Sequence, residues 1–287
     1  ITDKKSYISL KKITNKTNIR VFNNFDDFDK IFKTKIDYTM SAITGIDGLI
    51  PTINIIKFTK NIAIANKEAI ICGWNLIFKE LNKNKTNFIP VDSEHFSIWY
   101  GILNNNKGIK KIYLTASGGP FLNLPLNKFN KIKISQALKH PNWKMGKKIT
   151  IDSATMMNKV FEVIEAKNIF NISYDKISIL SHPQSYIHAI IKFNNGLIKL
   201  IAHDTDMKIP IFNTLYRDQL KSIKSKKINF EKLNNLRLKS INIKKFPSIK
   251  ILNILPKKNS LFETVVVSAN DELVNLFLKN HISFTEI

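Results

Sequence analysis

Cysteine is almost absent from this sequence, which has a single residue of that type, Cys72, in 287 positions. A lone cysteine excludes an intramolecular disulfide and any zinc or iron–sulfur site built from several thiolates, and it is typical of a reducing compartment. Long apolar runs are also absent: no stretch reaches the roughly 18 to 20 residues of a membrane span, and the start of the chain lacks the apolar region of a signal peptide. We therefore expect a cytoplasmic protein with no membrane partner.

Acidic residues are few, with 22 against 45 lysines and arginines, and the formal net charge is +23. Such a charge ordinarily favours a nucleic-acid partner. The lysines, however, are scattered among Asn, Ile and Phe, and the basic clusters at 221–227 and 243–258 lack the aromatic or arginine-rich pattern of a nucleic-acid-binding surface. We expect no nucleic-acid partner and attribute the composition to an A+T-rich genome.

The chain is long enough to bury a sizeable core. Hydrophobic residues make up 44% of its 287 positions, which is typical of a globular protein of roughly two domains. There is no methionine at position 1, and we expect the chain to begin inside a longer protein.

The first part of the chain has the alternating pattern of a parallel α/β layer. Short strand-like and helical runs occupy residues 18–22, 26–32 and 38–43. A helical pattern that ends at Ile56 follows, and then an apolar run at 61–65. Asn66, Lys67 and Glu68 follow the last of these runs, at the carboxyl end of a strand, where ligands bind in open α/β sheets. The same tripeptide is equally compatible with a helix start.

Two carboxylates follow the next predicted strand, at 87–91. Residues two apart on a strand face the same side, so Asp92 and Glu94 converge, and like charges held together need a cation or a proton between them. Hard divalent cations such as Mg²⁺ prefer that arrangement. Asp92 and Ser93 are also good N-cap residues, so a simple helix start is the alternative.

The only adjacent glycines, Gly118 and Gly119, follow a short predicted strand at 112–114. A Gly-Gly turn lets backbone N–H groups and the hydroxyl of Ser117 approach a phosphate closely. An ordinary tight turn before Pro120 is the alternative.

Residues 140–165 form the stretch around which the chain is organised. A β-branched run at 149–151 precedes Asp152 and Ser153, which are good N-cap residues, and we expect a helix to start near Ala154. At about 100° per residue the apolar side chains fall on one side of this helix. The other side contains Thr155, Asn158, Lys159 and Glu162. Such groups near a helix N-terminus favour a bound anion such as phosphate, although a solvated polar face has the same pattern.

The remaining sequence predicts strands, a linker and a helical region. The strands are 177–180, 185–193 and 197–202, the last two joined as a hairpin through 194–196. His182, His188 and His203 lie on them without ligand spacing, and we expect most of these histidines to be structural. Residues 213–245 read as a lysine-rich linker, and a helical region opens at Phe246, with its last helix starting in 268–272.

Five blocks of the sequence carry a family resemblance. They are Ile-Ala-Asn-Lys-Glu at 64–68, Pro-Val-Asp-Ser-Glu-His at 90–95, Ser-Gly-Gly-Pro-Phe at 117–121, the stretch 140–165, and His-Pro-Gln-Ser at 182–185. Over nearly the whole chain, and in the same order, they resemble the 1-deoxy-D-xylulose 5-phosphate reductoisomerase family. The resemblance implies an NADPH-dependent oxidoreductase that rearranges this sugar phosphate and reduces it to 2-C-methyl-D-erythritol 4-phosphate, in the non-mevalonate route to isoprenoids.

The resemblance also implies an α/β fold in several parts. These are a remnant of a Rossmann-type NADPH domain at 1–77, an α+β catalytic and connective domain at 78–212 with a dimer-forming sheet, the linker at 213–245, and a partial C-terminal helical domain at 246–287. We expect a bacterial, cytoplasmic homodimer rather than a plastid-type protein.

Site residues follow from the resemblance, motif by motif. Asp92, Glu94 and Glu162 would bind Mg²⁺ or Mn²⁺. The phosphate would be held by Ser117, Ser153, Asn158 and Lys159 with His140 nearby, and the substrate backbone by Ser93 and Lys67. The expected catalytic residues are Lys67, Glu94 and His140. The expected NADPH contacts are Asn66, Glu68 and Gly146, and residues 140–148, with Trp143 and Met145, resemble the family's flexible lid.

The chain also departs from the family. The Gly-rich dinucleotide fingerprint of the family's N-terminal strand–turn–helix is missing, and the family's chain continues past the point matched by Ile287. Ala116 and Thr205 replace a usual Gly and a usual Pro. We expect a fragment that binds substrate and metal, binds NADPH weakly and turns over negligibly. The alternative is a non-catalytic remnant that binds metal and sugar phosphate.

Overall fold

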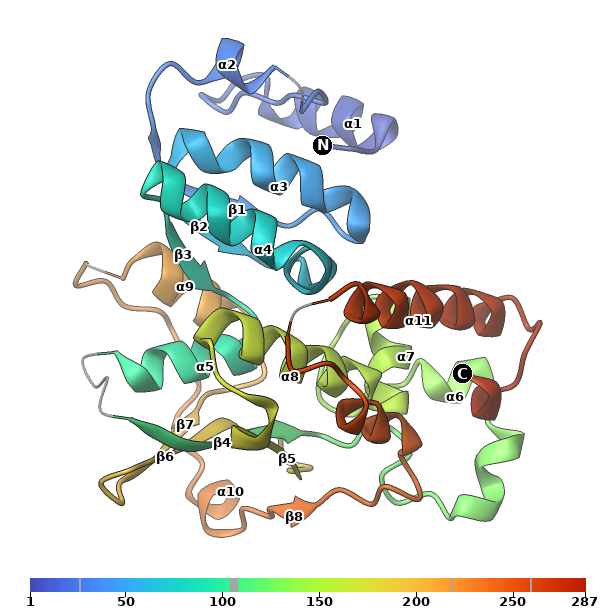
Figure 1. Ribbon diagram of the computed structural model, residues 1–287. Coiled ribbons are helices and arrows are strands. Elements are labelled where there is room, and N and C mark those ends of the chain that lie inside the picture. Colours follow the sequence, from blue (N-terminus) through green and yellow to red (C-terminus); the bar gives the residue numbers. More distant parts are fainter. Residues whose placement is uncertain (26, 104–107, 218, 259) are drawn as a thin grey trace. The chain divides into compact units, whose positions relative to one another are not determined.

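The computed structural model describes residues 1–25, 27–103, 108–217, 219–258 and 260–287 (Figure 1). It divides into two compact units, residues 1–89 and 90–287. Both units combine sheets and helices, which confirms the α/β class expected from the sequence. Among the described residues, no helix is both long and apolar enough to cross a membrane.

The first unit is built on a three-stranded sheet in the order β1-β2-β3. Strands β1 (Ile36–Ser41) and β2 (Thr59–Ile64) are parallel, as predicted, and helix α3 (Leu49–Ile55) lies between them in the chain. Helix α4 (Lys67–Asn84) connects β2 to β3 (Asn87–Pro90) and packs against α3. This arrangement places the start of α4 at the carboxyl end of β2, so the helix start that the sequence allowed at 66–68 is present, and the ligand site there stays a prediction.

The N-terminal segment of this unit differs from the prediction. The expected strand at 18–22 is irregular, because Ile19 and Phe22 stay exposed and the run joins no sheet in the described part of the chain. Helix α1 (Lys4–Thr14) precedes it and was not anticipated, although Asp3 caps it by accepting a hydrogen bond from the Ser6 N–H. Helix α2 (Phe28–Ile31) occupies the polar–apolar stretch, whose residue 26 lies outside the described residues.

The second unit contains a five-stranded sheet in the order β7-β6-β4-β5-β8. Its strands are β4 (Ile109–Ala116), β5 (Ile177–Ser181), β6 (Ile187–Phe193), β7 (Ile198–Ala202) and β8 (Lys239–Ser240). The β4 and β5 strands are parallel and the other pairs are antiparallel, with the predicted hairpin between β6 and β7. Helices α5 (Ser93–Ile102) and α8 (Met157–Phe170) supply Ile98 and Val163 to the core shared with β4 and β6.

The central stretch forms two helices where the sequence predicted one. Helix α7 spans Lys147–Thr155, and α8 begins at Met157 after Met156 adopts a left-handed conformation with φ of 68°. The predicted start near Ala154 is therefore wrong: the β-branched run 149–151 is helical. Ile151 lies in a buried apolar cluster with Val274 and Phe277, and this burial outweighs the modest helix propensity of the run. The predicted phosphate-binding residues Ser153, Asn158 and Lys159 thus lie on either side of a junction between two helices.

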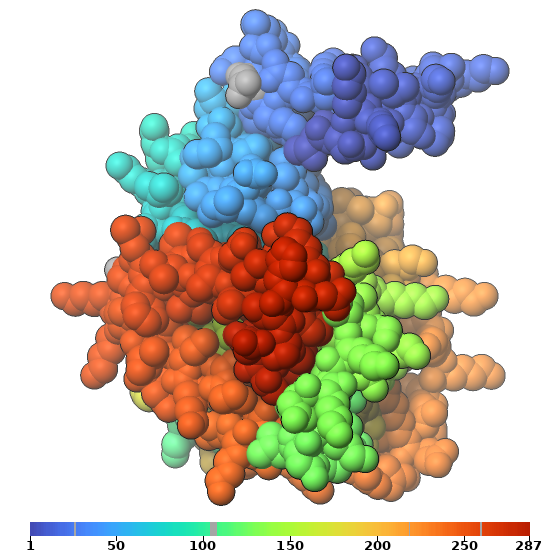
Figure 2. All heavy atoms as spheres, turned by 90° about the vertical axis from the view of Figure 1, so that its right-hand side faces the viewer, coloured from blue at the N-terminus to red at the C-terminus, as the bar shows by residue number. Residues whose placement is uncertain are grey.

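The C-terminal segment is mostly helical, as predicted, but its last helix begins earlier. Helix α11 spans Phe262–Leu278, so it starts before the expected 268–272. The remaining helices are α6 (Ile134–Ala137), α9 (Lys208–Leu215) and α10 (Phe230–Asn234), with 3-10 turns η1 (Ile46–Gly48), η2 (Ile56–Phe58), η3 (Leu126–Lys131), η4 (Tyr174–Lys176), η5 (Pro247–Asn253) and η6 (Phe284–Glu286). Figure 2 shows the end of the chain in red beside the green segment that precedes α7.

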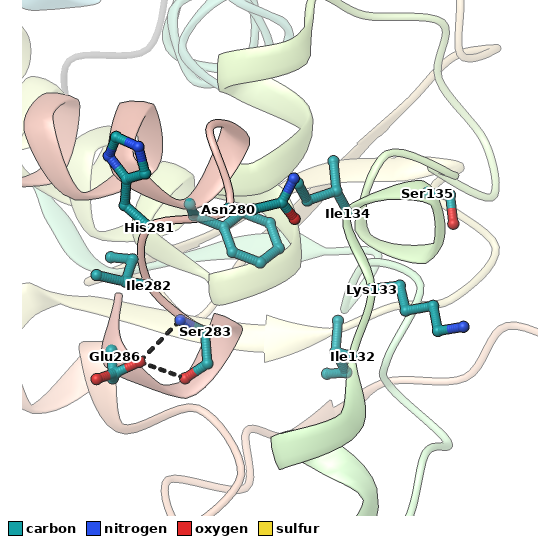
Figure 3. A pocket seen from close by; sticks show the side chains of 10 residues that line it. Ile132, Lys133, Ile134, Ser135, Asn280, His281, Ile282, Ser283 and Glu286 are labelled. Atoms are coloured by element: carbon teal, nitrogen blue, oxygen red, sulfur yellow. Dashed lines mark hydrogen bonds between the residues drawn. The ribbon is translucent and has the colours of Figure 1, made fainter.

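One surface pocket lies between these red and green segments (Figure 3). Its lining comes from 132–135 and from the stretch that begins at Phe277 and ends at Glu286, whose carboxylate caps η6 through Ser283. None of the residues that the sequence predicted for a site lines this pocket. The candidate chemistry lies elsewhere in the second unit.

Candidate functional site

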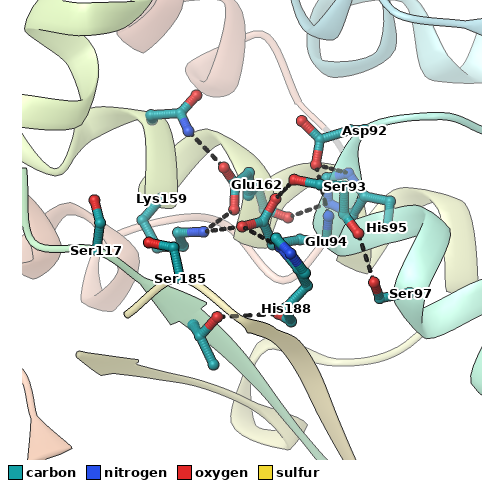
Figure 4. A network of polar contacts seen from close by, with 12 residues as sticks. Asp92, Ser93, Glu94, His95, Ser97, Ser117, Lys159, Glu162, Ser185 and His188 are labelled. Atoms are coloured by element: carbon teal, nitrogen blue, oxygen red, sulfur yellow. Dashed lines mark hydrogen bonds and ion pairs between the residues drawn. The ribbon is translucent and has the colours of Figure 1, made fainter. Parts of the chain in front are cut away.

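Three carboxylates from two helices converge in the second unit (Figure 4). Asp92 and Glu94 come from the start of α5, and Glu162 comes from the second turn of α8. Each can offer one oxygen such that all three oxygens lie within 4.8 Å of one another. The structure therefore brings together the three residues that the resemblance proposed as metal ligands.

The convergence of Asp92 and Glu94 has a different cause from the one predicted. Strand β3 ends at Pro90, so the two residues do not share a strand face. Asp92 is the N-cap of α5 and accepts a hydrogen bond from the Glu94 backbone N–H at 3.2 Å, while Ser93 donates its hydroxyl proton to the Glu94 carboxylate. The capping role and the clustering of carboxylates, which the sequence left as alternatives, thus occur together.

A buried lysine lies against two of these carboxylates. The Lys159 ammonium is 3.2 Å from Glu94 Oε1 and also contacts the Glu162 carboxylate, and the side chain is only 5% exposed. Burial would raise the pKa of Glu94, but the positive charge of Lys159 and the neighbouring His188 ring lower that pKa to about 2. Burial would lower the pKa of Lys159, but Glu162 and Glu94 raise it. Glu94 and Lys159 are therefore both ionised near neutral pH.

A second buried cationic side chain, that of His95, contacts the carboxylate cluster. The His95 Nε2–H donates to the Glu162 carbonyl at 2.8 Å, and its Nδ1 lies 3.3 Å from Asp92 Oδ1 and 4.0 Å from Glu165 Oε2. Burial would lower the pKa of His95, but the charges of Glu165 and Asp92 raise it to about 9. His95 thus connects α5 to α8. The sequence analysis did not single out His95 or Glu165, because nothing in their spacing indicated that they would meet.

The balance of charges at this point fits a divalent cation. Counted at their formal charges, the carboxylates of Asp92, Glu94, Glu162 and Glu165 contribute four negative charges. Lys159 and His95 contribute two positive charges, which leaves a formal excess of about two negative charges in a largely buried place. Oxygen ligands with such an excess of negative charge are those that Mg²⁺ and Mn²⁺ prefer. The donor set thus fits the metal that the resemblance implied.

A hydroxyl and an imidazole lie together beside the glycine pair. Ser117 Oγ is 3.1 Å from His140 Nε2 and accepts a hydrogen bond from the Gly119 N–H. Gly119 has φ of +62°, and a Cβ there would meet the Ser153 carbonyl oxygen at 2.9 Å, so only glycine fits this approach to α7. Ser117 and Ser153, predicted as phosphate-binding residues, thus lie on segments in direct contact.

The lid segment is tied to these groups by hydrogen bonds. His140 Nδ1 accepts from the backbone N–H groups of Asn142 and Trp143, at 3.1 and 2.9 Å. The Asn142 side chain donates to Ser185 Oγ at 2.8 Å, and the Trp143 ring packs edge-on against His188. The segment that resembles the family's lid therefore contacts the start of strand β6 and the residues just before it.

Because His140 Nδ1 accepts two hydrogen bonds, its proton must be on Nε2, and burial lowers the pKa of this imidazole to about 4. We expect the ¹⁵N resonances of His140 to show the Nε2–H tautomer at pH 7 and to titrate well below the ordinary histidine range near pH 6.5. His140→Asn would assign the resonances. Protonation complete by pH 6 would contradict this hydrogen-bond arrangement.

The three downstream histidines do not share one role. His182 is structural, as expected: its ring contacts the Arg237 carbonyl and accepts from the Tyr186 and Ile187 N–H groups. His188 lies at the acidic cluster, 3.8 Å from Glu94 Oε1, and stacks on His203 with 3.8 Å between ring centroids. A polar residue inside the apolar strand β6 was the signal that could have identified His188.

The predicted cofactor residues are divided between the units. Asn66 caps α4 by accepting from the Ala69 N–H, and its amide donates to the carbonyls of Ile43 and Gly45. Lys67 and Glu68 form the first turn of α4. Gly146 is the N-cap of α7, and space for a Cβ is open there. Asn66 therefore fixes the loop beside the carboxyl end of β2.

Comparison with known proteins gives one consistent result. Residues 1–73 match the family model described as 1-deoxy-D-xylulose 5-phosphate reductoisomerase, and 88–170 and 203–287 match two models of the C-terminal domain of that enzyme. The reductoisomerase of Pelagibacter ubique is 63% identical over 100% of this chain and 75% of its own length, and that of Sulfurihydrogenibium sp. is 40% identical over 99% of this chain and 76% of its own length.

Solved structures of the same enzyme are also similar. The reductoisomerase from Zymomonas mobilis in complex with NADPH has a TM-score of 0.88 and 32% identity, and covers 100% of this chain and 74% of that one. A reductoisomerase in complex with NADPH, fosmidomycin and magnesium has a TM-score of 0.84 and 29% identity, and covers 99% of this chain and 73% of that one.

Proposed function

The chain belongs to the 1-deoxy-D-xylulose 5-phosphate reductoisomerase family, and from that premise we propose how its residues serve the reaction. This reaction rearranges the carbon skeleton of 1-deoxy-D-xylulose 5-phosphate and reduces the product with NADPH to 2-C-methyl-D-erythritol 4-phosphate, in the non-mevalonate route to isoprenoids. The observation that supports the assignment of roles is the convergence of Asp92, Glu94 and Glu162 beside the Lys159 ammonium.

We assign the metal to the carboxylates of Asp92, Glu94 and Glu162. A bound Mg²⁺ or Mn²⁺ supplies Lewis acidity to the carbonyl and hydroxyl oxygens of the substrate. Asp92 is fixed as a helix cap, and His95 holds both it and the backbone of Glu162. These contacts prevent the carboxylates from moving apart, so that the oxygens meet the ion with little reorganisation.

The phosphate of the substrate is assigned to Ser117, Ser153, Asn158 and Lys159. Asn158 and Lys159 lie in the first turn of α8, where the helix dipole favours an anion. Their side chains now donate to Glu162, and a bound cation would neutralise that carboxylate and release both donors for the phosphate. His140 supports this end of the site through Ser117 and, being neutral, acts as a hydrogen-bond donor.

We propose the other catalytic and cofactor roles on the same ground, which is membership of the family. Lys67 and Ser93 contact the substrate backbone, and Lys67, Glu94 and His140 act in catalysis. Asn66, Glu68 and Gly146 contact NADPH, which fits the ligand position at the carboxyl end of a parallel strand. The residues of α4 involved here begin that helix, where backbone N–H groups are available to an anionic cofactor.

We also propose that the protein is a homodimer in the bacterial cytoplasm. Strand β7 is an edge of its sheet among the described residues, and Leu197 just before it and Ile198 and Leu200 within it are half exposed or more. Apolar side chains on an unpaired edge are a feature of pairing surfaces. The relatives named above are bacterial, and a single cysteine is typical of a reducing compartment.

Calorimetric titration of the chain tests the proposal. With Mn²⁺ present we expect 1-deoxy-D-xylulose 5-phosphate to bind about tenfold or more tightly than unphosphorylated 1-deoxy-D-xylulose, because the phosphate adds charge-assisted hydrogen bonds. Chelation of the metal should weaken binding of both sugars. Equal affinities for the two sugars would contradict the phosphate site. Oxidation of NADPH, followed by its absorbance, then shows whether the chain turns over faster than the negligible rate expected of it; measurable turnover would contradict the alternative of a protein that only binds metal and sugar phosphate.

A further inference from the structure

A buried carboxylate outside the proposed site joins α7 to the C-terminal helix α11. Asp152 is 1% exposed, and its Oδ1 accepts a hydrogen bond at 2.8 Å from the side-chain amide of Asn270, which is 4% exposed. Its other oxygen is 2.9 Å from the Lys148 ammonium, one turn earlier in α7. Both oxygens of this buried carboxylate are therefore occupied, one by each helix.

The same lysine makes a second connection to α11. Lys148 Nζ lies 3.0 Å from Asp271 Oδ1, so a single ammonium bridges a carboxylate on each helix. Apolar contacts continue the junction, since Ile151 and Ala154 of α7 share a buried cluster with Val274 of α11. Helix α11 thus holds α7 by a network of side chains more than a hundred residues away in sequence.

This network lies next to a residue that we assign to phosphate binding. Ser153 follows Asp152 directly, and on its other side its backbone touches Gly119, where even a Cβ would come within 2.9 Å. The C-terminal end of α7 is consequently held between the glycine turn and α11. A shift of Asp152 cannot occur without moving Ser153 or breaking the contact with Gly119.

We propose that Asn270 and Asp271 of α11 are positioning residues for the phosphate site, because they hold Asp152 and Lys148 and thereby set the place of Ser153. The inference rests on the proposed function, since it takes Ser153 as a phosphate ligand. None of the four residues in the network is among those assigned to the substrate. Through these contacts, the phosphate site at Ser153 depends on helix α11, which comes from the end of the described chain.

The cost of burying Asp152 explains why these partners matter. Burial raises the pKa of Asp152, and Lys148 and Asn270 oppose that effect. A buried carboxylate that loses one of its donors must find water, take up a proton or move. Any of these responses changes the end of α7 at which Ser153 lies.

The test compares two asparagine substitutions on the same helix. Asn270→Ala removes the donor to Asp152, whereas Asn275→Ala changes an exposed side chain of α11. With saturating Mn²⁺, we expect Asn270→Ala to weaken calorimetric binding of 1-deoxy-D-xylulose 5-phosphate about tenfold, and Asn275→Ala to change it less than about twofold. Affinities for Mn²⁺ and for unphosphorylated 1-deoxy-D-xylulose should stay within about twofold in both variants, because Ser153 contacts neither.

Exchanging the side chains of Asp152 and Asn270 tests whether the loss of affinity comes from their contact or from general damage to the fold. Asp152→Asn leaves two amides facing one another, and Asn270→Asp leaves two carboxylates. The double variant restores one amide donor and one carboxylate between α7 and α11. In every variant Lys148 can still contact Asp271. We expect both single variants to lose affinity for the phosphorylated sugar and the double variant to regain most of it. Circular dichroism establishes that each variant is folded at the temperature of titration.

The outcomes separate the inference from the function on which it rests. Unchanged affinity of Asn270→Ala for the phosphorylated sugar, or a double variant as weak as the single ones, would overturn the positioning role. A loss of affinity shared equally by both sugars would do the same, since it would indicate general damage. If the unmodified chain binds neither sugar in the presence of Mn²⁺, the proposed function itself fails.

Discussion

Replacing Glu162 by Gln should weaken Mn²⁺ binding about tenfold or more, which is roughly 1.4 kcal/mol. Glu162 is 1% exposed and is the only one of the three clustered carboxylates that α8 supplies. The amide keeps the shape of the side chain but removes one negative charge from a set whose excess charge is about two. Calorimetric titration with Mn²⁺, in the presence of substrate, measures the effect.

The matched control for this substitution is Glu272→Gln, which removes the same charge from an exposed position on α11. We expect its Mn²⁺ affinity to equal that of the unmodified chain, because an exposed charge is screened by solvent. Equal affinities for Glu162→Gln and Glu272→Gln would show that α8 does not contribute a metal ligand.

Replacing Lys159 by Met should have opposite effects on metal and phosphate. In the metal-free protein the ammonium neutralises Glu94 and Glu162, and its removal leaves buried carboxylates uncompensated, which costs about 3 kcal/mol of the free energy of unfolding. Mn²⁺ no longer competes with the ammonium for these oxygens, so it should bind more tightly than to the unmodified chain. The phosphorylated sugar, which loses a cationic partner, should bind at least about tenfold more weakly.

Urea denaturation measures the first effect, with the metal removed by a chelator and then restored. The stabilisation produced by saturating Mn²⁺ should be larger in Lys159→Met than in the unmodified chain, because the ion replaces the lost positive charge. Lys279→Met, at an exposed position after α11, is the control for the loss of a lysine. Weaker Mn²⁺ binding by Lys159→Met would mean that this lysine supports the metal ligands instead of competing for them.

The direction of the change in Mn²⁺ affinity distinguishes the role of Glu162 from that of Lys159, although both residues lie in α8. Glu162 and Lys159 are three residues apart and contact each other, so their single effects on stability are not additive. Their effects on Mn²⁺ affinity should nevertheless differ in direction. A general loss of structure would instead lower both affinities together.

Several elements could be predicted because their cause is local. The parallel pair β1 and β2, the hairpin between β6 and β7, and the helical C-terminal region follow from short-range periodicity and turn residues. The residue types and motifs of the candidate site are likewise visible in the sequence, because they do not depend on geometry. Their roles as ligands stay predictions that the experiments above address.

Errors arose where a distant contact outweighed a local preference. The run 149–151 favours a strand, yet it is helical because Ile151 is buried against the C-terminal helix. Asp152 and Ser153 have the form of a helix cap, but the real break is the left-handed Met156. Residues 18–22 alternate as a strand does, but no neighbouring strand pairs with them in the described part of the chain. Local propensity amounts to tenths of a kcal/mol per residue, and burial of one side chain exceeds it.

The chemical groups of this protein and the order of its motifs can be read from the chain alone, because side-chain chemistry and short-range periodicity do not depend on folding. Which groups meet depends on folding, and the three-dimensional structure brings together His95 with Glu165, His188 with Glu94, and Asp152 with Asn270. The charge state of a buried group depends on neighbours that folding brings from distant segments, since desolvation and Coulomb interactions act through space. For this reason His95 and His140, two residues of one type, have pKa values of about 9 and about 4 in one protein.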